Sequence, residues 1–567
     1  MCGIFFYYGN YYLTSEELFK AFMLIKYRGP DETKEVHNIG DKYGKINYGF
    51  HRLSINGLDK ESGQPMNFAD CSLMCNGEIY NFKELAVEYG IDLKTHSDCE
   101  IIIHLYKKIG FINMLNKLEG VFSIVLYDFI KERTYIARDP VGIRPLFYGK
   151  VLNKDEYIFA SEAKCLFTSF MDTTTIKQFP ASSYLIFNTK DMVHSPFRFK
   201  LYCDLYINTQ NSAIIPKLSY GQTINELRRL VNRAVDIRCN ITDRPVGALL
   251  SGGIDSSIIS MIAKTKIPSL RTFSIGLATG TDLLPAKLAA EAIGSNHTEV
   301  IFTVEEALAS IEEVIRILET PDITTIRAST PMYLLSKYIK ENTDIVVVLS
   351  GEGPDEVFAG YLYNHSAPSS MELQKDAEKR IKELPFYDVL RADRSTAAHS
   401  LEVRVPFLCK NIVNLSMHTD PEYRDPKSKY NKGIEKKMMR IGFSDIKEYL
   451  PKSNEEQCNK WKYIINRPKE AFSDGVGYEW KQSLKNLAES LISDEEYAKR
   501  NELYSIMTPE NKEAFLYRKI YEKYYSRPYN CPLVKQFWLP TWGDHGGDPS
   551  ATVLNIHSSK HGREHSD

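Results

Sequence analysis

One short loop constrains the fold of the C-terminal half of this chain more than any other feature. The segment Ser251–Ser257 reads SGGIDSS, follows the apolar run Val246–Leu250 and precedes the helical run Ile258–Lys264. A strand, a loop of small residues and a helix start form a cradle whose backbone N–H groups and hydroxyls bind anions. The loop lacks both the Gly-Lys-Ser/Thr ending of a Walker A motif and the Gly-x-Gly-x-x-Gly of dinucleotide-binding domains. The sequence therefore predicts a phosphate site of another kind.

Strand-like and helical runs alternate beyond residue 223. Ile224–Asn240 has helical spacing, and the runs Pro245–Leu250, Arg271–Ile275 and Asp344–Leu349 are strand-like. This rhythm predicts a doubly wound α/β domain with a parallel sheet. Ligands of such sheets bind outside the carboxyl ends of the strands, so the loop after residue 250 and the turn after residue 349 should share one crevice.

The first 200 residues show a different sequence pattern. Short aromatic and β-branched runs follow one another closely, with Gly, Pro and Asp turns between them. The clearest strands are Val121–Tyr127, Thr134–Ala137, Tyr157–Ala160 and Tyr184–Phe187, and the clearest helices are Ser15–Lys26 and Asp98–Gly110. This pattern predicts an α+β sandwich of antiparallel sheets between helices. The irregular stretch 195–223 is interpreted as a linker, which gives expected domains of residues 2–200 and 201–567.

Charge and cysteine content exclude several classes of protein. The 71 Lys and Arg residues nearly balance 73 acidic residues, so nothing favours nucleic acid or an anionic membrane surface as a partner. No apolar run reaches the roughly 18 residues that span a bilayer, and no secretory pattern opens the chain. The ten cysteines form no Cys-x-x-Cys pair. We therefore expect a cytoplasmic protein with reduced thiols.

A cysteine at position 2 begins a series of motifs. Removal of Met1 would give Cys2 its own base, because an α-amino group with a pKa of about 7.7–8.0 would lie beside the thiol. The motifs Gly29–Asp31, His51–Ile55, Cys75–Asn81 and Ser97–Glu100 follow in order. Together they resemble the glutaminase domain of the class II, N-terminal-nucleophile glutamine amidotransferases.

The resemblance implies a chemistry for this domain. Cys2 would attack the side-chain amide of glutamine, and ammonia would leave. The side chain of Asn76 and the backbone N–H of Gly77 would stabilise the oxyanion. Arg52 would bind the α-carboxylate of glutamine, and Glu78 and Asp98 would hold its α-ammonium. The implied glutamine-binding residues are thus Arg52, Asn76, Glu78 and Asp98.

The loop of the second half resembles the pyrophosphate loop of N-type ATP pyrophosphatases, which cut ATP between its α- and β-phosphates. The resemblance implies Mg²⁺ at Asp255 and Asp355, whose hard oxygens suit that ion. The implied residues that bind ATP and pyrophosphate are Leu250, Ser251, Gly252, Gly253, Asp255, Ser256, Ile275, Ser350, Gly351 and Lys469.

Further segments narrow the resemblance. With Thr324–Pro331, Arg391–Arg394, Ser400–Phe407 and Arg467–Gly475, the chain resembles the glutamine-hydrolysing asparagine synthetases up to about Ser550. The family implies that aspartate, ATP and glutamine are substrates, that β-aspartyl-AMP is the intermediate and that the enzyme is a homodimer. It implies that Glu352 is the base near the acyl adenylate and that Lys469 neutralises pyrophosphate. Two active sites imply a passage for ammonia lined by small, apolar groups.

Three residues depart from the family pattern, and two other functions remain open. Pro354, Ala359 and Cys409 stand where Ser, Gly and Asp are usual. One alternative is a related ligase with another acyl donor or acceptor, although such relatives often lose the nucleophilic cysteine. The other is a non-catalytic sensor of glutamine or nucleotide, which the intact Cys2 and Lys469 disfavour.

Overall fold

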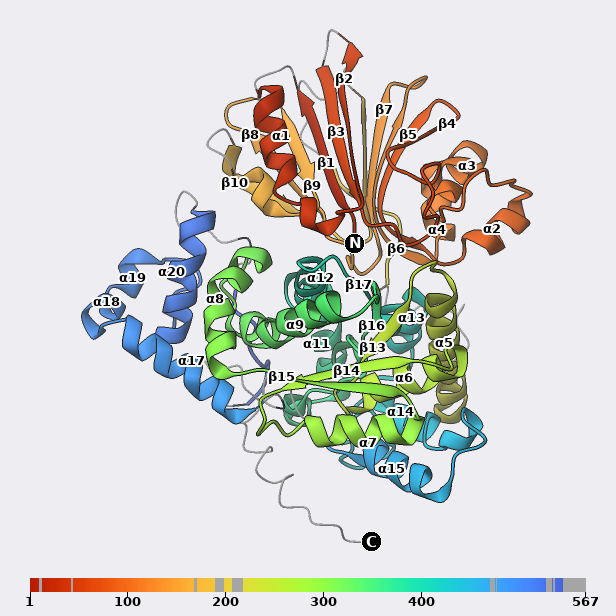
Figure 1. The fold of residues 1–567 in the computed structure, drawn as a ribbon, viewed down its shortest axis with the longest axis vertical. Coiled ribbons are helices and arrows are strands. Elements are labelled where there is room, and N and C mark those ends of the chain that lie inside the picture. The colour runs from red at the N-terminus through yellow and green to blue at the C-terminus, as the bar shows by residue number, and fades with distance from the viewer. Residues whose placement is uncertain are drawn as a thin grey trace.

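The computed structural model describes residues 1–567 except 10–12, 42–43, 155, 168–170, 189–197, 206–217, 470–474, 476, 527–532, 534–535 and 544–567. Within this described part, two antiparallel sheets form the N-terminal domain and a parallel sheet forms the centre of the C-terminal domain (Figure 1). The predicted linker and the segment after Lys469 fall partly outside the described residues.

The first sheet contains the start of the chain. Its strand order is β10 (Met171–Gln178), β8 (Phe147–Val151), β9 (Tyr157–Ala160), β1 (Gly3–Gly9), β3 (Gly44–Arg52) and β2 (Glu32–Asp41). The second sheet has the order β12 (Lys200–Leu201), β11 (Ser183–Asn188), β7 (Arg133–Arg138), β6 (Gly120–Asp128), β5 (Cys71–Ile79) and β4 (Met66–Phe68).

These sheets pack face to face between helices. In β1, Ile4, Phe6 and Tyr8 enter the cluster between the sheets, whereas Phe5 and Tyr7 pack under α1 (Ser15–Met23). Successive residues of a strand point to opposite faces, so a strand buried on both sides is apolar throughout. The described part of this domain has three further helices, α2 (Phe82–Tyr89), α3 (Glu100–Ile109) and α4 (Phe111–Lys117). Of these, α3 and α4 pack on the second sheet. The predicted α+β sandwich is confirmed.

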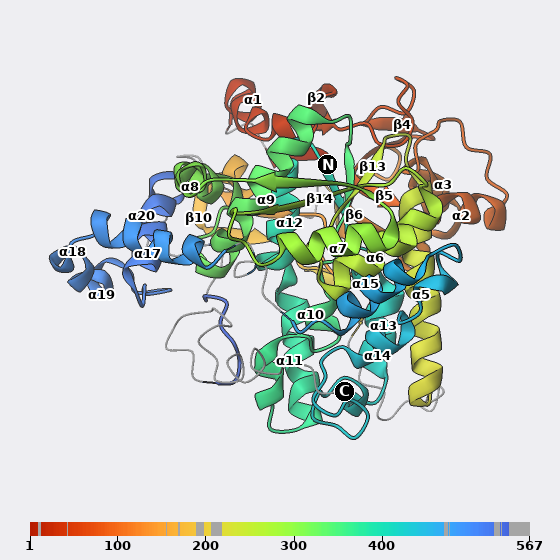
Figure 2. The same cartoon turned by 60° about the horizontal axis from the view of Figure 1, so that its bottom comes forward.

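The third sheet is parallel at every pairing that the structure describes. Its order is β15 (Asn296–Ile301), β14 (Arg271–Gly276), β13 (Val246–Leu249), β16 (Val347–Leu349) and β17 (Glu402–Arg404). Because βαβ crossovers are right-handed, this order places α6 (Ile254–Lys266) and α7 (Leu283–Ile293) on one face and α9 (Ile323–Asn342) on the other (Figure 2). The predicted doubly wound sheet is confirmed.

Other helices surround this sheet. They are α5 (Tyr220–Asn240), α8 (Val304–Leu318), α10 (Pro354–Val357), α11 (Ser370–Glu383), α12 (Asp388–Ala397), α13 (Lys410–His418), α14 (Lys437–Gly442), α15 (Glu455–Asn466), α17 (Tyr478–Leu491), α18 (Asp494–Ala498), α19 (Arg500–Leu503) and α20 (Lys512–Tyr525). Among the described helices, none combines the length and the apolar character needed to cross a membrane.

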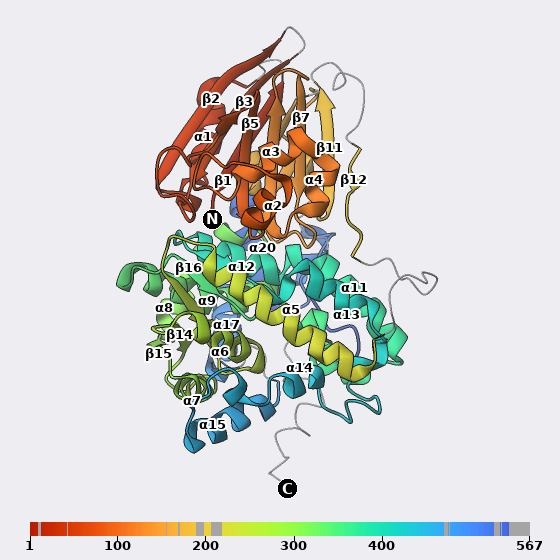
Figure 3. The ribbon, with the colours of Figure 1, turned by 90° about the vertical axis from the view of Figure 1, so that its right-hand side faces the viewer.

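The N-terminal sheets stand end-on above the C-terminal domain (Figure 3), and buried ion pairs join the two. Arg28 lies 2.7 Å from Glu162 and 2.8 Å from Asp393 of α12. The next residue of α12, Arg394, lies 2.6 Å from Glu162 and 2.9 Å from Glu319. All five side chains are almost fully buried. Buried side chains of opposite charge, contributed by both domains, therefore pair with one another at this interface.

Candidate active sites

Cys2 directly precedes β1 and lies where the two domains meet. Its backbone N–H donates to Asn76 Oδ1 at 3.0 Å, and its thiol donates to the Leu53 carbonyl at 3.7 Å. Burial raises the pKa of the Cys2 thiol. Burial also lowers the pKa of the Met1 ammonium to about 6. Burial would act in the same direction on an α-amine at Cys2, and it would favour the neutral form that can accept a proton from the thiol.

An unpaired donor faces the same place. Asn76 is fully buried, and its Nδ2 amide has no hydrogen-bond partner among the described residues. A buried donor without a partner is costly, so it marks a position where a ligand atom can accept the bond. Its neighbour Gly77 has no space for a side chain, because an added Cβ would lie 2.1 Å from the Val121 carbonyl oxygen.

Carboxylates converge beside Asn76. Asp98 accepts from the Ile79 N–H at 2.6 Å, and the Asn56 amide donates to both Asp98, at 3.3 Å, and Glu78. Burial raises the pKa of Asp98 to about 6 and, with nearby carboxylates, raises that of Glu78 well above its usual range. Arg404 lies 3.3 Å from Glu78 and partly neutralises this group, whose other carboxylate oxygens can accept hydrogen bonds from a bound cation. Sequence reasoning missed Asn56.

Arg52 is buried at the end of β3. Its guanidinium donates to the Asp59 carbonyl at 2.9 Å and to the Gly57 carbonyl, and it lies 3.8 Å from Glu32. These contacts orient the planar fork that a carboxylate requires.

A cavity of about 240 Å³ opens at the carboxyl ends of β13, β14 and β16. The residues predicted from sequence to bind ATP all line it except Gly252. In its wall, Ser251 Oγ lies 3.1 Å from Ser256 Oγ. Gly351 packs so closely on the loop that an added Cβ would lie 2.6 Å from the Ser256 nitrogen.

The two glycines of the loop have different roles. Gly252 has a φ of +73°, and a Cβ there would lie 2.3 Å from the Pro285 carbonyl carbon. Gly253 has extended backbone, and the nearest atom to an added Cβ is Ser251 Oγ at 3.4 Å. Gly252 is thus required for folding of the loop, whereas Gly253 borders the ligand space.

This difference gives a test by stability. We expect Gly252→Ala to lower the free energy of unfolding by about 1–3 kcal/mol, because it combines backbone strain with a clash. Gly253→Ala should change it by less than about 0.5 kcal/mol, yet weaken ATP binding. Urea unfolding without nucleotide, followed by nucleotide titration, measures both effects. Equal stability of the two variants would contradict the assignment.

Two lysines hold the acidic side of the cavity. Lys436 Nζ lies 2.6 Å from both Asp255 and Asp355, and Lys469 Nζ lies 2.7 Å from Asp355. Burial opposes ionisation of Asp355, but the two ammonium groups outweigh it and lower its pKa to about 2. Lys436 was missed from the sequence, where it is one lysine in a charge-rich stretch. Only its buried, left-handed position (φ 52°) sets it apart.

The aspartates also fit a divalent cation. Asp255 Oδ1 is buried and lacks a hydrogen-bond partner in the described structure. A carboxylate oxygen is a hard acceptor that suits Mg²⁺. The described residues contain no group of three or more His, Cys, Asp or Glu side chains that could hold a metal ion. Phosphate oxygens would therefore have to complete the coordination.

Glu352 lies on the turn that follows β16 and leads to Asp355. Its carboxylate accepts from Arg391 at 2.8 Å, and Arg391 also pairs with Asp388 at 2.8 Å. Burial raises the pKa of Glu352 although Arg391 opposes this effect. A carboxylate with a raised pKa is a better proton acceptor.

The three departures from the family pattern have definite places. Pro354 is the first residue of α10, where its ring and its missing N–H are tolerated. Ala359 has a φ of 52°, a left-handed conformation that favours glycine. Cys409 precedes α13 without capping it through its side chain, and its thiol lies 3.5 Å from Glu119 Oε1.

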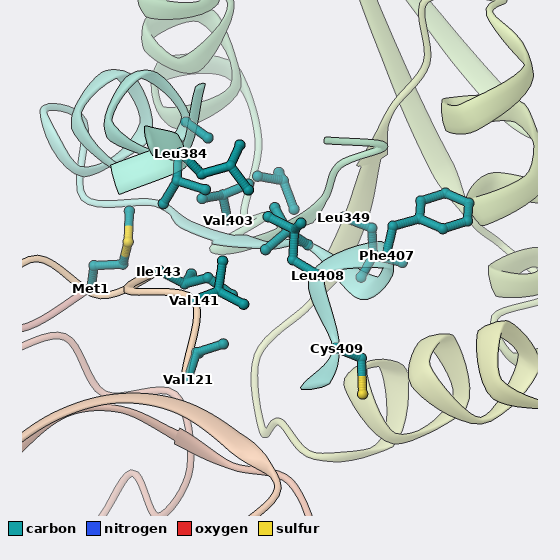
Figure 4. Close-up of a cluster of buried hydrophobic side chains, with 14 of the residues drawn as sticks. Met1, Val121, Val141, Ile143, Leu349, Leu384, Val403, Phe407, Leu408 and Cys409 are labelled. Atoms are coloured by element: carbon teal, nitrogen blue, oxygen red, sulfur yellow. The ribbon is translucent and has the colours of Figure 1, made fainter. Parts of the chain in front are cut away.

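Apolar side chains of both domains pack together where the domains meet (Figure 4). From the N-terminal domain come Met1, Val121, Val141 and Ile143, and from the C-terminal domain come Leu349, Leu384, Val403, Phe407, Leu408 and Cys409. One continuous buried cluster therefore includes side chains next to Cys2 and side chains next to the turn of Glu352.

Comparison with known proteins covers both halves. A family model described as asparagine synthase matches residues 226–542, and one described as glutamine amidotransferase domain matches residues 1–211. The glutamine-hydrolyzing asparagine synthetase of Rattus norvegicus is 38% identical over 586 residues, with 99% of each chain covered. The Homo sapiens protein of that name is 38% identical over 587 residues with the same coverage.

Proposed function

The chain belongs to the glutamine-hydrolysing asparagine synthetases, and we propose that its two sites work in series to make L-asparagine. Glutamine hydrolysis at Cys2 supplies ammonia, and the cavity of the C-terminal domain activates aspartate with ATP. We place the glutaminase domain at residues 2–200 and the synthetase domain at residues 201–567. The observation that carries this proposal is the apolar cluster that links an unpaired oxyanion donor to a phosphate loop within one chain.

In the first half-reaction the Cys2 thiolate attacks the amide carbon of glutamine. The α-amine exposed by removal of Met1 takes the thiol proton and passes it to the leaving ammonia. The Asn76 amide and the Gly77 N–H stabilise the oxyanion. Arg52 binds the carboxylate of glutamine, while Glu78 and Asp98 hold its ammonium. Water then cleaves the thioester and releases glutamate.

In the second half-reaction the β-carboxylate of aspartate attacks the α-phosphorus of ATP, and pyrophosphate leaves. The loop from Ser251 to Ser256 cradles the phosphates, and Lys469 neutralises the departing charge. Asp255 and Asp355 would hold Mg²⁺, which would supply further charge neutralisation. Ammonia then attacks the acyl carbon, AMP leaves, and Glu352 accepts the proton from the new nitrogen.

Ammonia travels between the sites through the apolar cluster of Figure 4. Neutral ammonia passes apolar walls, whereas ammonium would have to shed its hydration there. In bulk water most of it would be protonated and lost to synthesis.

Val403→Phe tests this path, because Val403 is 2% exposed within the cluster. Displacing an overpacked side chain costs about 1–3 kcal/mol, so we expect asparagine formed per glutamate to fall at least about fivefold. Synthesis from ammonium should stay near the wild-type rate. Val151→Phe, fully buried in β8 within a separate cluster under α1, controls for overpacking. Equal coupling in both variants would refute the path.

A product count tests the function as a whole. The protein is incubated with aspartate, MgATP and glutamine, and asparagine, glutamate, AMP and pyrophosphate are measured together. Asparagine and pyrophosphate should appear in step. If pyrophosphate never forms with aspartate, the synthetase assignment fails and another carboxylate, or a sensor role, replaces it.

We also propose that the protein acts in the cytoplasm as a homodimer. The cysteines in the described part of the chain are all free, which agrees with a reducing compartment. The dimer is an expectation from the family alone. Light scattering should give twice the mass of one chain, and a monomer would refute this expectation.

A further inference from the structure

A segment near the C-terminus closes the synthetase cavity. We define the C-terminal strap as residues 536–543. Its Trp538 and Pro540 line the same cavity as the phosphate loop and Glu352, although nearly two hundred residues separate Trp538 from Glu352 in the sequence. The strap belongs to no helix or strand, so its position depends on the contacts that tie it to its neighbours.

Those contacts are specific. The backbone N–H of Trp538 donates to Asp322 Oδ1 at 2.8 Å. Asp322 also caps α9, because it accepts from the backbone N–H of Thr325 at 2.8 Å. Arg380 of α11 donates to Thr541 Oγ1 at 2.9 Å, and its guanidinium lies 4.8 Å from the centre of the Trp538 ring. The Tyr387 hydroxyl donates to the Gln536 carbonyl at 2.9 Å. These bonds fix the strap to three different segments.

Trp538 lines the cavity, and a chain of contacts connects it to Glu352. The residue is 7% exposed, and the centre of its ring lies 5.3 Å from that of Tyr361, whose hydroxyl donates to Glu356. Arg391 pairs with both Asp388 and Glu352 at 2.8 Å, and Tyr387, the residue before Asp388, holds Gln536 of the strap. This part of the cavity therefore combines charged groups of both signs with a large apolar wall.

That combination suits a small amino acid bound through its charges. An acyl adenylate reacts with any water that reaches its acyl carbon, so its site must exclude water. We propose that Trp538 forms the wall of the acyl-substrate subsite, where it limits the length of the acyl group and keeps water from the acyl adenylate. This inference rests on the proposed function.

Loss of the wall has a balanced chemical consequence. Water attacks the acyl carbon of β-aspartyl-AMP, the acyl–phosphate bond breaks, and aspartate and AMP are released with one proton. Each such turnover consumes ATP and forms pyrophosphate without asparagine. The ratio of pyrophosphate to asparagine therefore reports on the wall directly.

The experiment compares Trp538→Ala with Trp542→Ala. Trp542 lies in the same strap and packs against Ala359, Ala367 and Leu373, but it is not among the side chains that line the cavity in the described structure. Both reactions use saturating ammonium as nitrogen donor, so the glutaminase site takes no part. Glutaminase activity and the melting temperature of each variant verify that it is folded.

We expect the pyrophosphate-to-asparagine ratio to rise at least about threefold in Trp538→Ala because water gains access, and to stay at the wild-type value in Trp542→Ala. Glutamate is one methylene longer than aspartate, so its relative rate of pyrophosphate release should rise about tenfold in Trp538→Ala alone. Unchanged ratios and unchanged discrimination in Trp538→Ala would overturn the inference. So would identical changes in both variants. A wild-type protein that releases no pyrophosphate with aspartate overturns the proposed function and this inference together.

Discussion

Cys2→Ala is expected to abolish glutamine hydrolysis while synthesis from ammonium continues. Removing the nucleophile of a covalent mechanism costs at least about 10³-fold, because the remaining oxyanion donors cannot replace the attacking atom. The Cys2 thiol donates to the Leu53 carbonyl, its backbone N–H donates to Asn76, and Cys2 is not among the described residues that line the synthetase cavity. Only the glutaminase half should therefore lose activity.

The measurement is glutamate release from glutamine, together with asparagine formed from ammonium, in the same preparation. Cys203→Ala is the matched control, because Cys203 is a half-buried free thiol in the stretch interpreted as the linker. Glutaminase activity that survives in Cys2→Ala would remove Cys2 from the mechanism. Intact mass shows whether Met1 is cleaved; full glutaminase activity with Met1 retained would contradict the role of the Cys2 amine.

Lys469→Met is expected to lower pyrophosphate formation by about 10²–10³-fold with either nitrogen donor, since a charge that stabilises the transition state in a buried site is lost. The loss should appear in kcat, because the pyrophosphate charge concentrates as the bond breaks. Lys436 would remain beside Asp355, so that carboxylate stays paired and the fold is retained.

Glutaminase activity within about twofold of the wild type would show that the N-terminal site is intact in this variant. Lys462→Met, an exposed lysine of α15, removes the same charge away from the cavity. A Lys469→Met enzyme that forms pyrophosphate at the rate of this control would exclude Lys469 from catalysis.

Local signals predicted much of the fold. The strand before Ser251, the loop and the helix after it appear as β13, the cavity wall and α6. The helix predicted at Asp98–Gly110 is α3, Glu100–Ile109. In each case the pattern of apolar and small residues lies within about twenty positions, where periodicity and turn chemistry decide the outcome.

Strand β17 is an element that local sequence signals could not predict. Its residues Glu402, Val403 and Arg404 are all buried, yet two of three are charged. Arg404 lies 2.7 Å from Glu402 and 3.3 Å from Glu78 of the other domain. Burial of such charges requires partners, and a partner more than three hundred positions away cannot be recognised from a short window. Lys436 escaped prediction for the same reason.

The ion pairs between the domains have a consequence for how such a chain can change over generations. Without the other half, Arg28 and Glu162 would keep each other but lose Asp393 and Arg394, and in a hybrid that buries them again a charge without its partner costs about 3–5 kcal/mol. A recombination event that exchanges one half must therefore bring complementary charges for Asp393 and Arg394. The buried charges at this interface therefore restrict the exchange of single domains, and we expect the two domains to be inherited together.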